Sequence, residues 1–162
     1  MKLQLLAIGR LKTGPERDLV DRYRARIGGL ARAEGFASLD AVEFPEGRGR
    51  SVAERQASEA SRLLDHAQGA ALVVFDERGT LLSSVEFANK LRAWRDSGRA
   101  AAAFVIGGPD GLSEDIRVRA DLLVSFGRLT LPHQLVRALV AEQIYRALTI
   151  LSGHPYHRGE PR

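Results

Sequence analysis

The chain is predicted to be an α/β protein, a three-layer sandwich in which a mainly parallel sheet lies between two layers of helices. Short apolar runs of strand length alternate with longer segments whose apolar residues repeat at helical spacing. Two of these runs, 70–75 and 101–106, are apolar at almost every position, which is typical of strands buried on both faces. This alternation favours parallel strands joined by crossover helices.

The composition is that of an ordinary globular protein, because 44% of the 162 residues are hydrophobic and 27% are charged. No run approaches the roughly 20 apolar residues of a membrane span, and the first apolar run is too short for a signal peptide. The absence of cysteine excludes disulfides, thiolate catalysis and cysteine-bound zinc. We therefore expect a single cytoplasmic domain without a membrane segment. The net charge of +4 suits a polyanion such as RNA, but it is also common in other proteins.

The N-terminal part of the chain shows a strand, a helix and a second strand. The run 2–8 is the first strand candidate. Pro15 fits the first turn of a helix, and apolar residues then repeat at helical spacing as far as Leu30. The segment 39–44 has a weaker strand pattern, which ends at Pro45.

Two serine–glutamate pairs mark the starts of the next helices. Ser51 with Glu54, and Ser83 with Glu86, have the spacing of a capping box. The first of these helices extends to about His66, which is expected at the surface. The second carries the only tryptophan at the same helical spacing as two other large apolar residues. That side chain is therefore expected in the core and not on a base-stacking surface.

A basic loop, Gly-Arg-Gly-Arg, occupies 47–50. Its two arginines suit a contact with phosphate, while a solvated turn is the simpler interpretation.

Ligands of parallel sheets bind beyond the carboxyl ends of the strands. The loops 76–79, 107–112 and 127–132 are therefore the candidate binding loops. The second is rich in glycine, but it lacks the lysine of a Walker A loop and the spacing of a dinucleotide fingerprint. Because Glu114 and Asp115 follow it, an uncharged or cationic ligand suits it better than a phosphate. The alternative is a tight turn that needs glycine for geometry alone.

The last third of the chain holds three of the four histidines. After a strand at 122–126, a helix at 133–151 is apolar on more than one face, which is typical of burial on several sides. We expect it to pack against its own sheet and against a second subunit, so that the protein is a homodimer; a core helix in a monomer is the alternative. The tail segment 154–157 has two histidines but no carboxylate partner, so a metal is disfavoured. That tail either binds substrate or is a frayed terminus.

Several motifs in this order closely resemble the bacterial RlmH (YbeA) family of minimal SPOUT-class methyltransferases, and the likeness covers essentially the full chain. The motifs are Met1–Gly9, Ile106–Ser113, Leu129–Arg137, Glu142–Ala147 and His154–Arg158. The resemblance implies methylation of N3 of a pseudouridine in 23S rRNA, within the assembled ribosome. It implies S-adenosylmethionine as cofactor, S-adenosylhomocysteine as product, no metal, a homodimer and a C-terminal trefoil knot. It also implies one domain over 1–158, followed by a disordered appendage at 159–162.

The resemblance assigns the cofactor to a set of residues at the three candidate loops: Phe75, Gly107, Phe126, Gly127, Arg128, Leu129, Thr130 and Leu131. Two positions depart from the family pattern. Phe75 stands in place of leucine, and Gly127-Arg128 replaces a pair that begins with serine. Contacts made by the backbone survive both changes.

From the chemistry of this reaction, we predict catalytic or RNA-binding roles for four side chains, as follows. His133 accepts the proton of N3, which must leave before the nitrogen can attack a methyl group. Arg158 stabilises negative charge on the neighbouring carbonyl oxygens. Tyr156 stacks on or hydrogen-bonds the base, and His157 contacts phosphate. A straight helix separates His133 from the tail by roughly 28.5 Å, so the tail either folds back or enters the site of a partner subunit.

Two other function classes compete with this one. A non-catalytic RNA- or ribosome-binding module would have the same fold and bind no S-adenosylmethionine. A nucleotide-phosphate enzyme is disfavoured, because the phosphate-binding fingerprints are missing.

Overall fold

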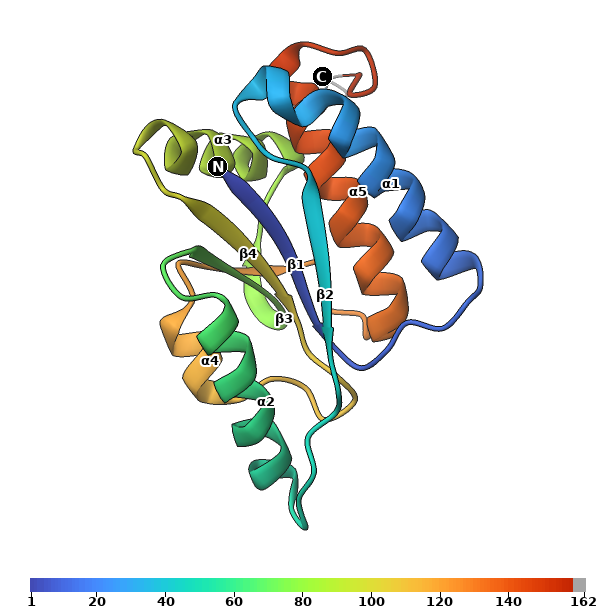
Figure 1. The fold of residues 1–162 in the computed structure, drawn as a ribbon, viewed down its shortest axis with the longest axis vertical. Helices are drawn as coiled ribbons and strands as arrows, with labels where there is room; N and C mark the ends of the chain where they lie inside the picture. Colours follow the sequence, from blue (N-terminus) through green and yellow to red (C-terminus); the bar gives the residue numbers. More distant parts are fainter. Residues whose placement is uncertain (159–162) are drawn as a thin grey trace.

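Five parallel strands form the central sheet of the computed structural model, which describes residues 1–158 (Figure 1). The strand order is β2-β1-β4-β3-β5. The strands are β1 (Lys2–Ile8), β2 (Leu39–Phe44), β3 (Ala71–Leu81), β4 (Ala101–Ile106) and β5 (Leu122–Ser125). The predicted appendage at 159–162 lies outside the described residues, and the domain limit at 158 stays a prediction.

Helices cover both faces of the sheet, which confirms the three-layer α/β class. One face carries α1 (Pro15–Ala31), the short 3₁₀ helix η1 (Arg32–Glu34), α3 (Ser84–Asp96) and α5 (His133–Ser152). The other face carries α2 (Val52–His66) and α4 (Glu114–Arg119). In Figure 1, α1 and α5 lie side by side, as their packing contacts also show.

The apolar runs of β3 and β4 are buried on both faces, as predicted. In β3, Val73 faces the core under α1, α3 and α5, while Val74 faces the core under α2 and α4. In β4, Phe104 and Val105 alternate in the same way, and both are fully buried. Because successive side chains of a strand point to opposite faces, each strand contributes to both cores.

Capping explains where two helices begin. Ser83 and Glu86 form the predicted reciprocal capping box, with hydrogen bonds of 3.2 Å and 2.7 Å. The predicted box at α2 is only half formed. Ser51 Oγ accepts from the N–H of Glu54 at 3.1 Å, but the Glu54 carboxylate accepts from the N–H of Arg50 instead of from Ser51. Glu54 therefore ties the preceding loop to the helix.

The predicted loop at 76–79 was wrong, because β3 continues through it to Leu81. The second half of β3 pairs with β5 after an irregularity between Phe75 and Thr80. Gly79 permits this approach, since a Cβ there would lie only 2.7 Å from the backbone nitrogen of Ser125. The pairing partner comes from far along the chain, and the polar sequence of the segment gives no local sign of it.

Helix α5 is buried on several sides, as its sequence predicted. It lies on the sheet between α1 and α3, and nine of its residues are buried. Neighbours within one chain account for this burial, so the predicted homodimer does not follow from it. The homodimer and the trefoil knot both stay predictions from the family resemblance.

Candidate active site

A cavity of about 680 Å³ opens at the carboxyl ends of β4 and β5 and beside the middle of β3, where the pairing of β3 with β4 ends. All three candidate segments line it, together with residues from the helices. The lining comprises 75–78, 106–112, 124–127 and 129–131, with Gln56, Glu114, Arg117, His133 and Val136. The structure thus brings the three segments together as the rule for parallel sheets predicts.

The glycine-rich loop is folded tightly against its neighbours. Gly108 and Gly111 form an isolated antiparallel bridge, and Gly111 has a φ of 75°. A Cβ on Gly107 would lie 2.9 Å from Leu112 Cγ, and one on Gly108 would lie 2.8 Å from Ile8 Cγ2. The glycines therefore serve the geometry of the turn, and they also leave backbone groups accessible at the cavity wall.

A bidentate ion pair holds the tip of this loop. Arg55 Nε lies 2.7 Å from Asp110 Oδ2, and its Nη2 lies 3.1 Å from Oδ1. Gln56 Nε2 donates to the Asp110 carbonyl at 2.7 Å. The hydrogen bond and the charge of Arg55 hold the pKa of Asp110 below its usual value. The pair therefore stays ionised at neutral pH, and it fixes the loop to the first turns of α2.

Aromatic and aliphatic side chains form the apolar part of the cavity. The rings of Phe75 and Phe126 stack at 5.3 Å with an interplanar angle of 16°. Phe126 is 38% exposed and Leu129 is 84% exposed, so both offer apolar surface to a ligand in the cavity. Phe75, which departs from the family pattern, thus has a specific partner in this chain.

The charge of the cavity favours a cation over a phosphate. Its lining includes the carboxylates of Asp76, Glu77, Asp110 and Glu114, against the guanidiniums of Arg78 and Arg117. Asp76 pairs with Arg117 at 2.9 Å, Glu114 with Arg78 at 3.5 Å and Asp110 with Arg55 at 2.7 Å. Among the ion pairs found within residues 1–158, Glu77 takes no part, so the lining, counted with Arg55, carries an excess of one carboxylate. This balance agrees with the ligand charge predicted from the sequence.

His133 is the first residue of α5 and its half-buried side chain lines the cavity. One turn later, Arg137 fixes the start of this helix to the sheet. Its Nη2 donates to the carbonyls of Ile8 and Gly9 at 2.7 Å and 2.8 Å, and Nη1 lies 2.8 Å from Glu43 Oε2. Burial lowers the pKa of Arg137, and the carboxylate of Glu43 opposes that effect.

The C-terminal tail folds back on α5, but it does not reach the cavity of its own chain. The Tyr156 hydroxyl donates to Glu142 Oε1 at 3.0 Å and lies 3.4 Å from the hydroxyl of Tyr23. Its ring packs on Tyr145, with centroids 4.8 Å apart, and beneath the guanidinium of Arg146. The α5 residues in these contacts lie from the middle of the helix onward, whereas His133 lies at its start.

The proposed cofactor residues lie together, and the proposed catalytic residues do not. All of the cofactor set except Arg128 line the cavity. Tyr156, His157 and Arg158 lie outside it in the same chain. Within residues 1–158, no cluster of three or more potential ligands is placed to hold a metal ion, and no helix is long and apolar enough to cross a membrane.

Sequence reasoning missed three side-chain interactions at the site: Asp76–Arg117, Arg55–Asp110 and Arg137–Glu43. Each joins residues that are more than 40 positions apart. The only local signal was the position of Arg137, one helical turn after His133.

Comparison with known proteins places the chain in a family. Residues 1–157 match the family model described as "Predicted SPOUT methyltransferase". A protein of Methylobacterium nodulans named ribosomal RNA large subunit methyltransferase H is 54% identical over 99% of this chain and 100% of that protein. Proteins of the same name from Bradyrhizobium sp. and Nitrobacter hamburgensis are 53% and 51% identical over 98% of this chain, and over 98% and 100% of their own lengths.

Solved structures share the fold at much lower identity. A probable methylase family protein from Haemophilus influenzae has a TM-score of 0.53 at 15% identity, over 99% of this chain and 72% of that one. A probable methyltransferase from Bordetella pertussis has a TM-score of 0.51 at 16% identity, over 90% and 95%. The fold, the cavity and the full-length sequence matches agree, and the chain belongs to the SPOUT methyltransferase family, among the proteins named ribosomal RNA large subunit methyltransferase H.

Proposed function

We propose that this protein methylates N3 of a pseudouridine in 23S rRNA of the large ribosomal subunit, with S-adenosylmethionine as methyl donor. The observation that carries the proposal is the cavity at the ends of β4 and β5 and beside the middle of β3, which nearly all of the expected cofactor residues line. Relatives that are more than half identical over the full chain are named for large-subunit rRNA methylation. We place the reaction in the cytoplasm, on the assembled ribosome.

The residues of the cavity fit the cofactor. A volume of about 680 Å³ lies within the usual range of roughly 300–1,000 Å³ for small-ligand sites. The excess of carboxylates suits a positively charged sulfonium. Phe75, Leu129 and Leu131 offer apolar surface, and Gly107 presents accessible backbone. When bound, S-adenosylmethionine supplies the methyl group.

The side chains of the chain itself then position the base and move its proton. His133 lies at the cavity wall, where its imidazole accepts the N3 proton of the pseudouridine. Arg158 stabilises the negative charge that spreads to the flanking carbonyl oxygens. Tyr156 orients the base and His157 contacts phosphate.

We infer that a homodimer completes the site. The tail contacts Glu142, at the middle of α5, and Tyr145 further along, whereas His133 is the first residue of that helix. A tail supplied by a second subunit places Tyr156 and Arg158 beside His133 without unfolding either element.

Single-turnover methylation of ribosomes with labelled S-adenosylmethionine tests these assignments. We expect His133→Ala and Arg158→Ala each to lower the rate by about 100-fold or more, with little change in cofactor affinity. Mixing the two inactive variants should restore part of the activity, because one site of a mixed dimer then has both residues. Wild-type rates in both variants would remove these residues from the mechanism.

Two further measurements test the reaction itself. Mass mapping of rRNA from a deletion strain should show the loss of one methylated pseudouridine. Calorimetric titration with S-adenosylmethionine separates the enzyme from a non-catalytic RNA-binding module, which would give no heat of binding.

A further inference from the structure

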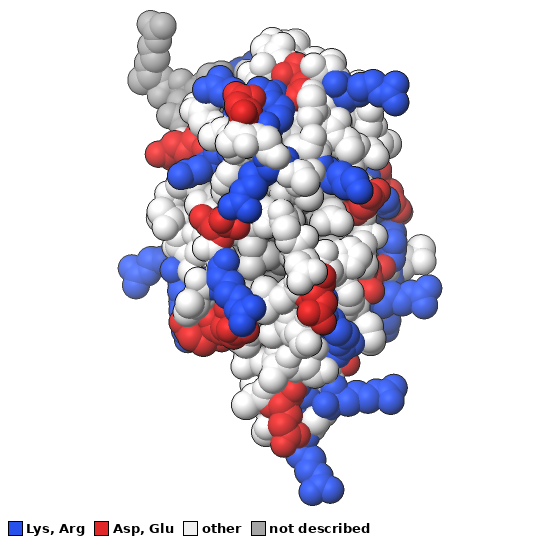
Figure 2. Space-filling model, turned by 60° about the vertical axis from the view of Figure 1, so that its left-hand side comes forward, with Lys and Arg blue, Asp and Glu red and all other residues white. Residues whose placement is uncertain are grey.

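The loop between β2 and α2 forms one tip of the molecule, at the bottom of Figure 1. Basic side chains project from that tip in Figure 2. Two arginines of this loop, Arg48 and Arg50, are exposed. Among the ion pairs found within residues 1–158, neither takes part. Both guanidiniums are therefore available to an external anion.

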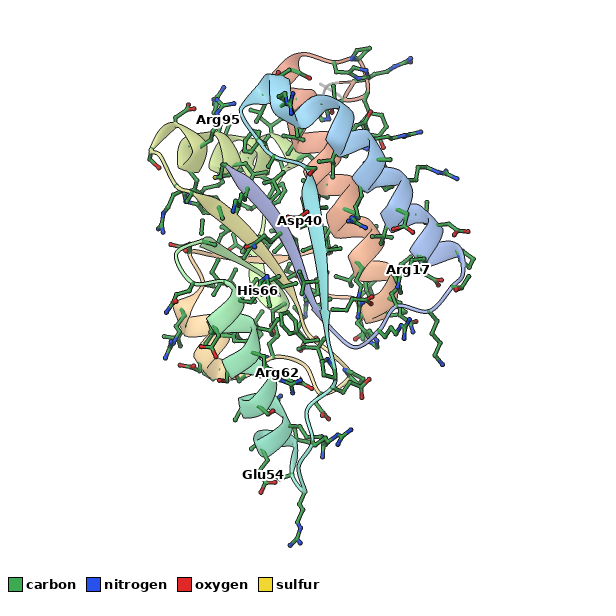
Figure 3. The ribbon with its side chains drawn as sticks, viewed as in Figure 1. Arg17, Asp40, Glu54, Arg62, His66 and Arg95 are labelled. Carbon is green, nitrogen blue, oxygen red and sulfur yellow. The ribbon has the colours of Figure 1, made fainter. Side chains whose placement is uncertain are left out.

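The backbone of this loop is held in place along its length. The N–H of Gly47 donates to Glu59 Oε1 at 2.7 Å, and Glu59 is only 3% exposed. The N–H of Arg50 donates to Glu54 at 2.8 Å. Arg62 on α2 donates to the carbonyl of Pro45 at 2.9 Å. In Figure 3, Glu54 lies at the lower tip and Arg62 lies further along the same helix.

The two glycines of the loop are required by close packing. A Cβ on Gly47 would lie 2.9 Å from the carbonyl carbon of Arg55, and one on Gly49 would lie 2.7 Å from Glu54 Cβ. Glycine thus lets the loop pack on α2, and the side chains at 48 and 50 are the ones left to project. A held backbone lowers the entropy cost of binding through these side chains.

The nearby carboxylates are mostly occupied. Glu54 and Glu59 accept backbone N–H groups of the loop, and Asp110 is paired with Arg55. Glu46 is the exposed acid that adjoins the two arginines in sequence. The tip therefore presents two guanidiniums, whose planar forks match phosphate oxygens well.

Arg55 connects this tip to the cavity. Its Nη1 donates to the carbonyl of Gly49 at 3.3 Å, while its Nε lies 2.7 Å from Asp110, which lines the cavity. The same guanidinium thus holds both the tip loop and the glycine-rich loop. The cavity has more carboxylates than guanidiniums, so affinity for a polyanion must come from basic groups outside it.

We propose that Arg48 and Arg50 form a phosphate-binding site for the ribosomal RNA substrate, which positions the RNA beside the cavity. This inference rests on the proposed function for the identity of the RNA. It replaces the simpler interpretation of the loop as a solvated turn.

The test compares Arg48→Gln/Arg50→Gln with a matched pair, Lys90→Gln/Arg92→Gln, which removes two exposed charges from α3 near the opposite end of the molecule in Figure 1. We expect the loop variant to raise the KM for ribosomes about 10-fold with unchanged kcat and unchanged affinity for S-adenosylmethionine. In fluorescence anisotropy with a labelled large-subunit rRNA fragment, its slope of log K against log [salt] should fall by about 0.7–0.9 for each lost phosphate contact. The α3 variant should match the wild type, and Arg48→Lys/Arg50→Lys should keep most of the slope.

A wild-type KM and a wild-type salt slope in the loop variant would overturn the inference and leave the loop as a solvated turn. An equal loss in the α3 variant would also overturn it, because only general charge would then matter. If the wild-type protein transfers no methyl group to ribosomes, the proposed function fails, and the anisotropy measurement still decides whether the two arginines bind RNA.

Discussion

Arg137 Nη1 lies 2.8 Å from Glu43 Oε2, although the two residues are 94 positions apart in the chain. Arg17 and the N–H of Leu11 also bind this carboxylate. Figure 3 shows Arg17 on α1, beside the lower end of α5. The interaction therefore joins the start of α5 to the ends of β1 and β2, one helical turn from His133.

Replacing Arg137 should destabilise the protein strongly. In Arg137→Leu, the carbonyls of Ile8 and Gly9 lose their donor and Glu43 loses a buried partner. We expect the free energy of unfolding to fall by roughly 2–4 kcal/mol, because buried polar groups are left unsatisfied. Urea denaturation followed by circular dichroism measures the change.

Arg119→Leu is the matched control, because Arg119 forms an ion pair with Asp115 at 3.1 Å while both side chains are more than half exposed. A change of about 0.5 kcal/mol or less is expected there. Similar losses in the two variants would mean that the buried pair contributes no more than a surface pair.

Glu43 should also make stability depend on acid pH. Burial by itself would raise the pKa of Glu43, but the N–H of Leu11 and the guanidiniums of Arg137 and Arg17 outweigh it and lower the pKa below the ordinary value of 4.5. The stability from this group is thus present above pH 4.5 and is lost as the pH falls through the lowered pKa. Urea titrations from neutral pH downward should show a shallower loss in Glu43→Gln than in the wild type. If the free energy of unfolding falls equally with pH in the two proteins, other carboxylates cause the loss of stability in acid.

Gly79 and Gly28 should respond in opposite ways to alanine. A Cβ on Gly79 would clash with the backbone of Val124 and Ser125, whereas one on Gly28 in α1 would meet nothing within 4 Å. We expect Gly79→Ala to cost about 1–3 kcal/mol by forcing β3 away from β5. Gly28→Ala should add about 0.5–1 kcal/mol through helix propensity. Thermal unfolding of both variants checks this, and a harmless Gly79→Ala would refute the close approach of the two strands.

Most elements of the fold could be predicted from the sequence, because their signals are local. Pro15, the Ser83–Glu86 capping box and the continuous apolar runs depend on neighbouring residues alone. The second half of β3 could not be predicted, since its strand conformation depends on pairing with β5, which comes more than 40 residues later. The same reason hid the ion pairs of the site, whose partners lie 41 to 94 positions apart.

The cofactor part of the candidate site could be predicted from the sequence, whereas the placement of the tail could not. The rule for parallel sheets and the family resemblance both led to the segments around Phe75, Gly107 and Leu129, and these segments share one cavity. The placement of the tail is different, because it depends on tertiary contacts of Tyr156 with Glu142 that have no pattern in the sequence.

The hydroxyl of Tyr156 should make stability depend on alkaline pH. Burial raises the pKa of Tyr156, and its hydrogen bonds with Tyr23 and Glu142 raise it further. The contribution is thus fully present below the ordinary tyrosine pKa of about 10 and is lost as the pH rises toward the higher folded value. Tyr156→Phe should flatten the fall in the free energy of unfolding above about pH 10. Tyr145→Phe leaves both hydrogen bonds of Tyr156 intact, so its free energy of unfolding should fall above about pH 10 as in the wild type. If the free energy of unfolding depends on pH in the same way in all three proteins, Tyr156 is not the group responsible.

Loosening the glycine-rich loop should weaken cofactor binding, and Arg55→Lys does this without altering a residue that lines the cavity. Arg55→Lys removes the bidentate contact with Asp110, and Asp110→Asn removes its charge, so the loop must then be ordered by the ligand. We expect the Kd for S-adenosylmethionine to rise about 3–10-fold in either variant, because the ligand must then order the loop, which costs binding free energy. The Kd of the double variant should not exceed the higher of the two single-variant values, because the two residues act through one interaction. Isothermal calorimetry gives these values, with Arg119→Lys and Asp115→Asn on α4 as the exposed ion-pair controls. An unchanged Kd in Arg55→Lys and Asp110→Asn would show that the glycine packing of the loop holds it in place without the ion pair.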